Sequence, residues 1–217
     1  MAAEGECWSQ TPEVQRLFPT FVWKAQLRPE VYEPLNALIL GRLEAMRRER
    51  PPLQQGETWQ SKHGLHGLPE FRSLVSCIHT AAEGVLEFLR IGSSELRITG
   101  CWANVSAPGG GHRTHTHPNN FLSGVYYVQV QADADTVNFH DPRGQAAIIR
   151  PPVTELTAYN TDQVVVEIGT GTLLVFPAWL PHSVDANRSE NPRISVSFNI
   201  MFASFAETMG EPLWGEK

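Results

Sequence analysis

The feature that most constrains the fold of this chain is a change of hydrophobic periodicity after Gly92. Residues 29–48 and 69–89 carry apolar side chains at spacings close to the 3.6-residue helical repeat. Pro29 fits the first turn of the first helix, and Pro51-Pro52 ends that helix. Beyond Gly92 the helical spacing gives way to short apolar runs separated by Gly, Pro, Asn and Asp. The sequence therefore predicts two helices followed by a region of short strands.

Short strands separated by turn residues are typical of a β-sandwich, barrel or jelly roll. We predict strands over residues 17–27, 96–106, 121–130, 136–139, 146–149, 164–168, 172–176 and 193–202. The helices need a sheet face against which to bury their apolar sides, so we do not divide the chain. We expect one mainly β domain over residues 1–217, with a strand and helices in 1–92, the β core in 93–203 and a tail in 204–217.

Composition and charge exclude several classes of protein. A chain of 217 residues with 41% hydrophobic side chains can bury a sizeable core. The net charge of −6 does not suggest a nucleic-acid partner. We expect no membrane span, because no run of about 18 apolar residues occurs, and the N-terminus does not resemble a signal peptide. Three widely spaced cysteines argue against a disulfide framework and favour a cytoplasmic location.

Histidines are concentrated in the stretch HRTHTHPNNFLSGVYY, residues 112–127. Residues two apart on an extended chain share a face, so His115 and His117 can direct their rings at one point. Pro118 disfavours a helical conformation at His117, which supports an extended chain. His182, after a different predicted strand, can supply a third imidazole. Three protein ligands leave coordination positions open, as iron oxygenases require, so the pattern predicts a catalytic metal centre.

A second constellation lies eleven residues beyond His182, where Arg193-x-Ser195 opens a strand. Arg193 and Ser195 share a face that points into the predicted roll. A buried arginine needs an anionic partner, and the neighbouring positions on that face are not acidic. A ligand carboxylate held by the guanidinium fork and the Ser195 hydroxyl satisfies this need. Tyr127, on the strand after His117, is our candidate for a second hydroxyl donor to that carboxylate.

The order of these motifs resembles that of the 2-oxoglutarate- and Fe(II)-dependent oxygenases, and more closely a family of small oxygenases of this type. The resemblance covers about residues 17–202. Its motifs are specific in combination and weak singly. They are LFPT at Leu17 to Thr20, Trp102-x-Asn104, His115-x-His117-Pro, Ser123 to Tyr127, Asp141-Pro-Arg143, His182 and Arg193-x-Ser195.

This resemblance implies a double-stranded β-helix core, of the jelly-roll or cupin-like type, flanked by α-helices. It also implies that His115 and His182 bind Fe(II), and that Arg193 and Ser195 hold the C5 carboxylate of 2-oxoglutarate. The cofactors would be Fe(II), the cosubstrate 2-oxoglutarate and O2, with succinate and CO2 released. Hydroxylation is the expected outcome, and desaturation or ring closure would need only a different substrate pose.

One departure from the family pattern leaves the third iron ligand open. The wider superfamily usually has Asp or Glu two residues after the first histidine, where this chain has His117. The third ligand is then His117, a distant carboxylate with Asp141 the best candidate, or water. Asp141-Pro-Arg143 is also a good turn sequence in its own right. Asn104 either hydrogen-bonds the cosubstrate or satisfies the end of a strand.

The sequence constrains the identity of the substrate least. Residues 150–162 are long enough to form a lid, with Tyr159 and Asn160 as candidate substrate contacts. Arg143 is a further candidate, as is Trp59 in a loop over residues 56–68. We expect a small-molecule substrate and no nucleic-acid or membrane partner. A homodimer is compatible with the sequence, although no feature requires one.

The histidines and the predicted metal site have other interpretations that the sequence also allows. A single histidine at a strand end usually lies at the surface, and we assign the histidines at 63, 66, 112 and 140 to this group. Three histidines are also a catalytic zinc site, which has no need of Arg193-x-Ser195. The alternative function is a cupin-like three-histidine dioxygenase, or a non-catalytic metal-binding β-roll, that does not use 2-oxoglutarate.

Overall fold

Two antiparallel sheets form the body of the molecule in the computed structural model, which describes residues 12–92, 95–144 and 151–207. The larger sheet has the strand order β1-β8-β5-β10-β3-β2, and the smaller has the order β4-β9-β6-β7. The strands are β1 (Trp23–Gln26), β2 (Thr58–Gln60), β3 (Leu96–Ser106), β4 (His112–His115), β5 (Leu122–Gln129), β6 (Thr136–His140), β7 (Gln163–Glu167), β8 (Thr172–Pro177), β9 (His182–Val184) and β10 (Arg193–Phe202).

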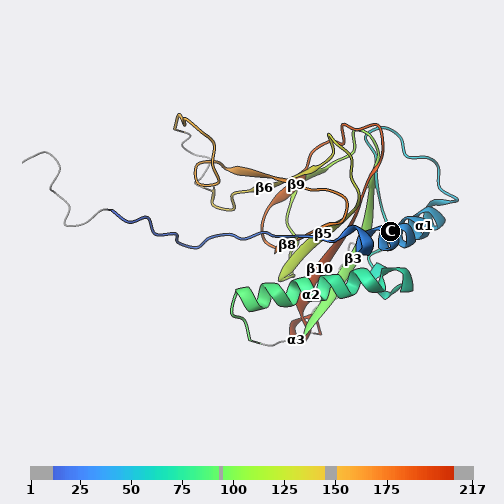
Figure 1. Cartoon of the computed structure of the whole chain (residues 1–217), viewed down its shortest axis with the longest axis horizontal. Helices are drawn as coiled ribbons and strands as arrows, with labels where there is room; N and C mark the ends of the chain where they lie inside the picture. Colours follow the sequence, from blue (N-terminus) through green and yellow to red (C-terminus); the bar gives the residue numbers. More distant parts are fainter. Residues whose placement is uncertain (1–11, 93–94, 145–150, 208–217) are drawn as a thin grey trace, which may run out of the picture.

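The helices lie against the outer face of the larger sheet, on the side away from the smaller sheet (Figure 1). They are α1 (Pro29–Arg47) and α2 (Arg72–Phe88), whereas the short α3 (Ala203–Ala206) directly follows the end of β10; 3-10 turns lie at Leu65–Gly67 and Pro69–Phe71. Along α2 the buried positions Leu74, Ile78 and Val85 are spaced by four and seven residues, so they form one apolar stripe. Burying each such side chain contributes about 1.5–3 kcal/mol. The stripe fixes α2 on the sheet.

Two hydrophobic clusters lie on opposite faces of the larger sheet. One joins this sheet to the helices and includes Tyr126 and Phe198. The other fills part of the space between the two sheets and includes Tyr127, Phe139 and Phe176. Successive side chains on a strand point to opposite faces, so adjacent tyrosines on β5 enter different clusters. This alternation decides which side chains face the space between the sheets.

The predicted mainly β fold with N-terminal helices is confirmed, and β3 and β10 have the predicted bounds. The opening strand is shorter than predicted, because Phe18 has a φ of 53° and is 96% exposed, outside any sheet. The short strands β2, β4 and β9 were not predicted. The strand predicted over 146–149 lies outside the described residues, as does most of the predicted tail.

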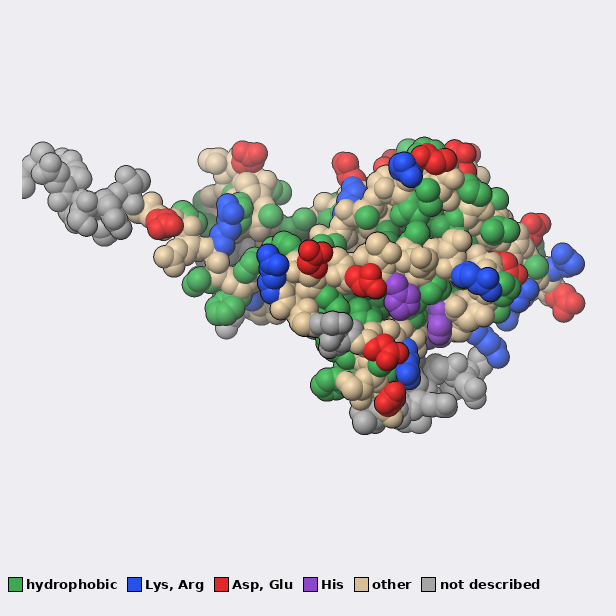
Figure 2. Space-filling view, turned by 60° about the horizontal axis from the view of Figure 1, so that its bottom comes forward, with side chains coloured by type: hydrophobic (Ala, Val, Ile, Leu, Met, Phe, Trp, Pro, Cys, Tyr) green, Lys and Arg blue, Asp and Glu red, His purple; other side chains and the backbone are tan. Residues whose placement is uncertain are grey.

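Figure 2 views the molecule turned so that the lower side of Figure 1 comes forward. Acidic, basic and apolar side chains are interspersed over this face, and the blue side chains form no continuous patch there. Within the described residues, no helix combines the length and the apolar character that crossing a membrane would require.

Candidate metal centre and adjoining pocket

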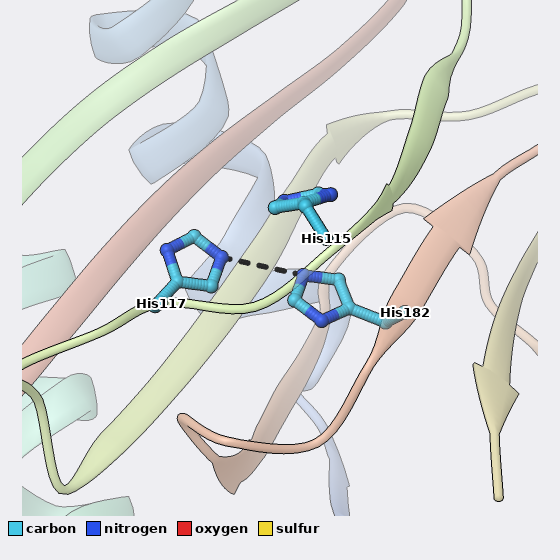
Figure 3. Close-up of side chains that lie close together, drawn as sticks. All are labelled: His115, His117 and His182. Atoms are coloured by element: carbon cyan, nitrogen blue, oxygen red, sulfur yellow. Dashed lines mark hydrogen bonds between the residues drawn. The ribbon is translucent and has the colours of Figure 1, made fainter. Parts of the chain in front are cut away.

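The smaller sheet brings three histidines together at one end of the space between the sheets. His115 ends β4 and is the Cα partner of His182, which begins β9. His117 follows two residues later, where its backbone N–H donates to the Ala178 carbonyl at 2.9 Å. One ligand nitrogen from each ring lies within 4.8 Å of the other two. Figure 3 shows the three rings gathered around one point.

Backbone contacts fix which nitrogen of two of these rings carries the proton. His115 Nδ1 lies 2.7 Å from the Arg113 carbonyl oxygen, and His182 Nδ1 lies 2.9 Å from the Leu180 carbonyl oxygen. A carbonyl oxygen only accepts, so each Nδ1 is the donor. A neutral ring then keeps its lone pair on Nε2. Such outer contacts orient histidine ligands in metal sites generally.

The third ring completes a geometry that suits a transition-metal ion. His117 Nε2 lies 3.3 Å from His182 Nε2. Two nitrogens bound to one ion at about 2.1 Å are themselves about 3.0–3.4 Å apart. Burial lowers the pKa of His117 to about 3 and that of His182 to about 4, and neighbouring imidazoles add to the effect in His117. Both rings are therefore neutral at neutral pH, which is the form that binds metals.

The pocket beside the histidines is walled on its other side by the larger sheet. Tyr127 on β5, Ser195 on β10 and Asn104 on β3 are Cα partners in one row across three strands. Gln60 on β2 extends that row. All four side chains line the same pocket as the three histidines. The structure thus brings together the residues that the sequence suggested for metal and cosubstrate.

Arg193 lies in this pocket as a buried cation with little compensation. Its residue is 4% exposed. Nη1 donates to the Ala134 carbonyl and Nη2 to the Asp185 carbonyl, each at 3.3 Å. None of the ion pairs within the described ranges includes Arg193. Burial lowers the pKa of this guanidinium. Its remaining donors are free to receive an anion in bidentate geometry.

Neutral polar side chains line the same pocket as Arg193. Burial raises the pKa of Tyr127, so its hydroxyl stays protonated, although the nearby Arg193 acts in the opposite direction. Gln60 Nε2 donates to Asn104 Oδ1 at 2.8 Å, and Asn104 Nδ2 donates to Ser197 Oγ at 3.0 Å. Sequence reasoning missed Gln60 and Ser197. Ser197 lies two residues after Ser195 on the same strand, so the alternation that placed Arg193 and Ser195 on one face also predicts Ser197 there.

Asp141, the alternative third ligand, is engaged elsewhere. Its carboxylate accepts from Arg143 Nε at 2.9 Å and from Arg143 Nη2 at 2.6 Å, and this pairing lowers the pKa of Asp141. The backbone N–H of Arg143 also donates to Asp141 Oδ1 at 2.9 Å, which closes a turn. The group of mutually close ligand atoms found in the described residues contains the three histidines and not Asp141. Arg143 likewise does not line the pocket.

Trp59 faces away from the pocket, so the structure corrects its suggested role as a wall. It pairs with Val105 and packs on the helix side of the larger sheet, where Arg47 lies 5.6 Å and Arg50 6.0 Å from its ring. Gln60, one residue later on β2, faces the pocket instead. The cause is strand alternation, since a shift of one residue exchanges the two faces.

The loop over residues 151–162 does not place its candidate residues at the pocket. Tyr159 is 80% exposed, and the Arg16 guanidinium lies 5.8 Å from its ring. Asn160 Oδ1 accepts from the Thr157 N–H at 2.7 Å, and its Nδ2 donates to the Glu155 carbonyl at 2.8 Å. Asn160 therefore stabilises the loop itself. Neither side chain lines the pocket in this conformation.

Two of the histidines assigned to the surface contribute to this region. His112 lines the pocket. His63 stacks on Trp102 with ring centroids 4.5 Å apart, and Trp102 lies 5.8 Å from the ring of His117. His140 faces the other side of the smaller sheet, where its Nε2 lies 2.8 Å from Ser183 Oγ. Sequence spacing alone did not separate these cases, because each depends on the face of a short strand.

The two-sheet roll, with a histidine triad and a buried arginine between its sheets, has the double-stranded β-helix fold with a candidate metal site. Three similar solved structures share this fold. The α-ketoglutarate-dependent carbocyclase SnoK from nogalamycin biosynthesis has a TM-score of 0.61 and 18% identity over 91% of this chain and 90% of its own. The epimerase SnoN from the same biosynthesis has a TM-score of 0.59 and 14% identity, over 91% and 89%. A Pseudomonas putida prolyl-4-hydroxylase has a TM-score of 0.56 and 16% identity, over 84% and 93%.

Residues 100–199 match the model of a family described as "Putative 2OG-Fe(II) oxygenase". This segment contains the three histidines and Arg193. This segment of the chain is similar to the 2OG-Fe(II) oxygenase family, whose members use Fe(II) and 2-oxoglutarate. These comparisons confirm the resemblance that the sequence suggested. They also confirm the fold and the enzyme class that this resemblance implied. No curated protein sequence matches the chain.

Proposed function

We propose that this chain is a dioxygenase that binds Fe(II) through His115, His117 and His182 and binds 2-oxoglutarate between the iron and Arg193. We further propose that it hydroxylates a small organic substrate. The observation that carries the proposal is that three imidazoles and a buried guanidinium, which has no ion pair among the described residues, face one pocket. A dicarboxylate that chelates a metal at one end is the simplest ligand that satisfies both.

The histidines supply the metal half of the site. Two Nδ1–H groups are tied to backbone carbonyls, so the lone pairs on Nε2 are presented without rearrangement of the rings. Three protein ligands leave positions for a chelating oxo acid and for oxygen. When bound, the iron with 2-oxoglutarate and O2 would supply the oxidation of a substrate C–H bond, with succinate and CO2 released.

The larger sheet supplies the carboxylate half. The Arg193 fork is the group best suited to the distal carboxylate, because it can donate two parallel hydrogen bonds. Ser195 and the protonated Tyr127 hydroxyl are neutral donors on the same wall. Asn104 is held by Gln60 and therefore keeps one amide orientation. Together these groups would orient the cosubstrate while the surrounding side chains exclude water.

The choice of a small substrate rests on the surroundings of His117. The stacked rings of His63 and Trp102 form an aromatic wall beside this ligand. A net charge of −6 gives no electrostatic attraction to an anionic polymer. A compact organic molecule with an apolar surface fits such a wall. Desaturation or ring closure would follow from the same site with a different substrate pose.

Anaerobic difference spectroscopy tests this proposal directly. Fe(II) and then 2-oxoglutarate are added to the protein, and we expect the weak visible charge-transfer band of the chelate. His182→Ala should abolish the band. Arg193→Ala should keep iron binding but need far more 2-oxoglutarate, whereas the exposed control Arg97→Ala should behave as wild type.

Turnover provides a second readout. The wild-type protein should consume 2-oxoglutarate slowly without substrate, in an iron-dependent reaction that Arg193→Ala loses. Metal binding without the band, or unchanged 2-oxoglutarate affinity in Arg193→Ala, would contradict the proposal. Either result would instead favour a cupin-like metal centre that does not use 2-oxoglutarate.

A further inference from the structure

His112 lines the same pocket as the three candidate metal ligands and lies three residues before His115. On β4 it is the Cα partner of Val184, just as His115 is the partner of His182. The next residue after Val184 is Asp185, whose carbonyl accepts the 3.3 Å hydrogen bond from Arg193 Nη2. His112 and Arg193 therefore approach the same end of the pocket from opposite sheets, and both line it.

The backbone at this point is tightly constrained. A Cβ on Gly111 would lie 2.7 Å from the Val184 carbonyl oxygen, so only glycine allows β4 to approach β9 this closely. This close approach fixes the position of His112, the next residue. The half-buried imidazole is held in place by its strand and not by a polar partner.

The His112 ring has hydrogen-bonding capacity that the protein does not use. Neither ring nitrogen has a hydrogen-bond partner among the described residues, and its only ring contact is with His115 at 6.4 Å between centroids. Burial, together with the nearby His115 and Arg193, lowers the pKa of His112 to about 4. Whatever its protonation state, the imidazole has at least one N–H donor available.

We infer that His112 is a cosubstrate-binding residue that donates a hydrogen bond to the distal carboxylate of 2-oxoglutarate, opposite Arg193. This inference rests on the proposed function, because it assigns a residue to the ligand of that site. A carboxylate held by Arg193 has lone pairs left over on the side facing the smaller sheet. His112 is the polar side chain that the smaller sheet presents near Arg193. It thus closes the carboxylate site from the side of the smaller sheet.

A comparison of two oxo acids separates this role from a structural one. Binding of 2-oxoglutarate and of 2-oxovalerate, which has the same five carbons but lacks the distal carboxylate, is measured by calorimetry on the anaerobic Fe(II)-loaded protein. The variants are His112→Ala and His112→Gln, whose amide can still donate. His79→Ala on α2, outside the pocket, is the matched control. Iron affinity is measured separately for each.

We expect His112→Ala to weaken 2-oxoglutarate binding about tenfold, as the loss of one charge-assisted hydrogen bond implies. Binding of 2-oxovalerate and of iron should not change, and His112→Gln should recover part of the loss. Equal weakening of both acids, or no change in either, would overturn the inference while leaving the proposed function intact. Failure of the wild-type protein to bind 2-oxoglutarate would overturn the proposed function and the inference with it.

Discussion

Replacing Arg193 with methionine should make the ligand-free protein more stable while removing its affinity for 2-oxoglutarate. Methionine has similar length and no charge, so it fills the same space without a cation. Arg193 is 4% exposed, and among the described residues its guanidinium has two backbone acceptors, at 3.3 Å each. An ion buried without a counter-ion carries a penalty of several kcal/mol. The wild-type residue is therefore expected to destabilise the empty site.

The magnitude follows from two opposing contributions. Removing the charge relieves a desolvation penalty of about 3 kcal/mol, taken at the low end because the donors have partial compensation. Losing the two long hydrogen bonds costs about 0.5–1 kcal/mol each. The net expectation is a free energy of unfolding higher by about 1–2 kcal/mol. Truncating one partner of a buried charged hydrogen bond costs about 2–5 kcal/mol in binding, so 2-oxoglutarate affinity should fall by about 30-fold or more.

Urea denaturation of the metal-free protein at pH 7.5, followed by fluorescence, measures the first quantity. Arg97→Met is the matched control, because Arg97 is half-exposed and its ion pair with Glu207 at 3.4 Å should contribute less than 1 kcal/mol. A free energy of unfolding lowered by more than 1 kcal/mol in Arg193→Met would refute the reasoning. It would mean that the protein itself satisfies the guanidinium, and that no anionic ligand is needed.

Three further predictions concern the core and its titratable groups. Gly124→Ala should lower the free energy of unfolding by about 2–3 kcal/mol in urea, because its Cβ would lie 2.2 Å from the Phe198 ring; an unchanged midpoint would contradict this packing. Tyr126→Phe should lower the free energy of unfolding by about 1–2 kcal/mol, since it removes the 2.7 Å hydrogen bond to Asn36 Oδ1 in the core. A loss below about 0.5 kcal/mol would mean that Asn36 finds another donor. Burial raises the pKa of Cys101 to about 12, so mass spectrometry should find this thiol unalkylated at pH 8 until the protein unfolds. Because folding raises the pKa of the Cys101 thiol, the free energy of unfolding is unaffected by this group below its unfolded pKa near 9. It then falls as the pH rises towards 12, where the unfolded chain loses the proton and the folded protein keeps it.

The sequence predicted the elements that carry a long hydrophobic pattern. β3 and β10 were found at their bounds because 11 and 10 residues contain several periods of alternation. β2, β4 and β9 have only three or four residues, so their pairing comes from neighbouring strands and not from local pattern. The three histidines that the structure brings together were still named as candidate metal ligands, because their chemistry and spacing are visible without the strands that hold them.

The prediction of which side chains face the pocket was wrong on these short strands. Trp59 was placed at the pocket and Gln60 was overlooked, although the structure exchanges their faces. His112 was treated as a surface residue because nothing local indicates that β4 continues back to it. Such errors follow from the period of two along a strand, since one position of uncertainty inverts the prediction. Only the register with a partner strand resolves it.

Under the proposed function, the smaller sheet positions the candidate metal ligands and the larger sheet carries the carboxylate anchor, so the separation of the two sheets sets the length of ligand that can bridge them. The rings of Phe139 and Phe176 meet edge to face at 5.0 Å between the sheets, and Phe176 also contacts His182 at 4.7 Å. This aromatic pair keeps the two sheets apart beside the histidine triad. Under the proposed function, chain-length preference among dicarboxylic oxo acids would thus be adjustable by apolar substitutions that touch neither end of the ligand.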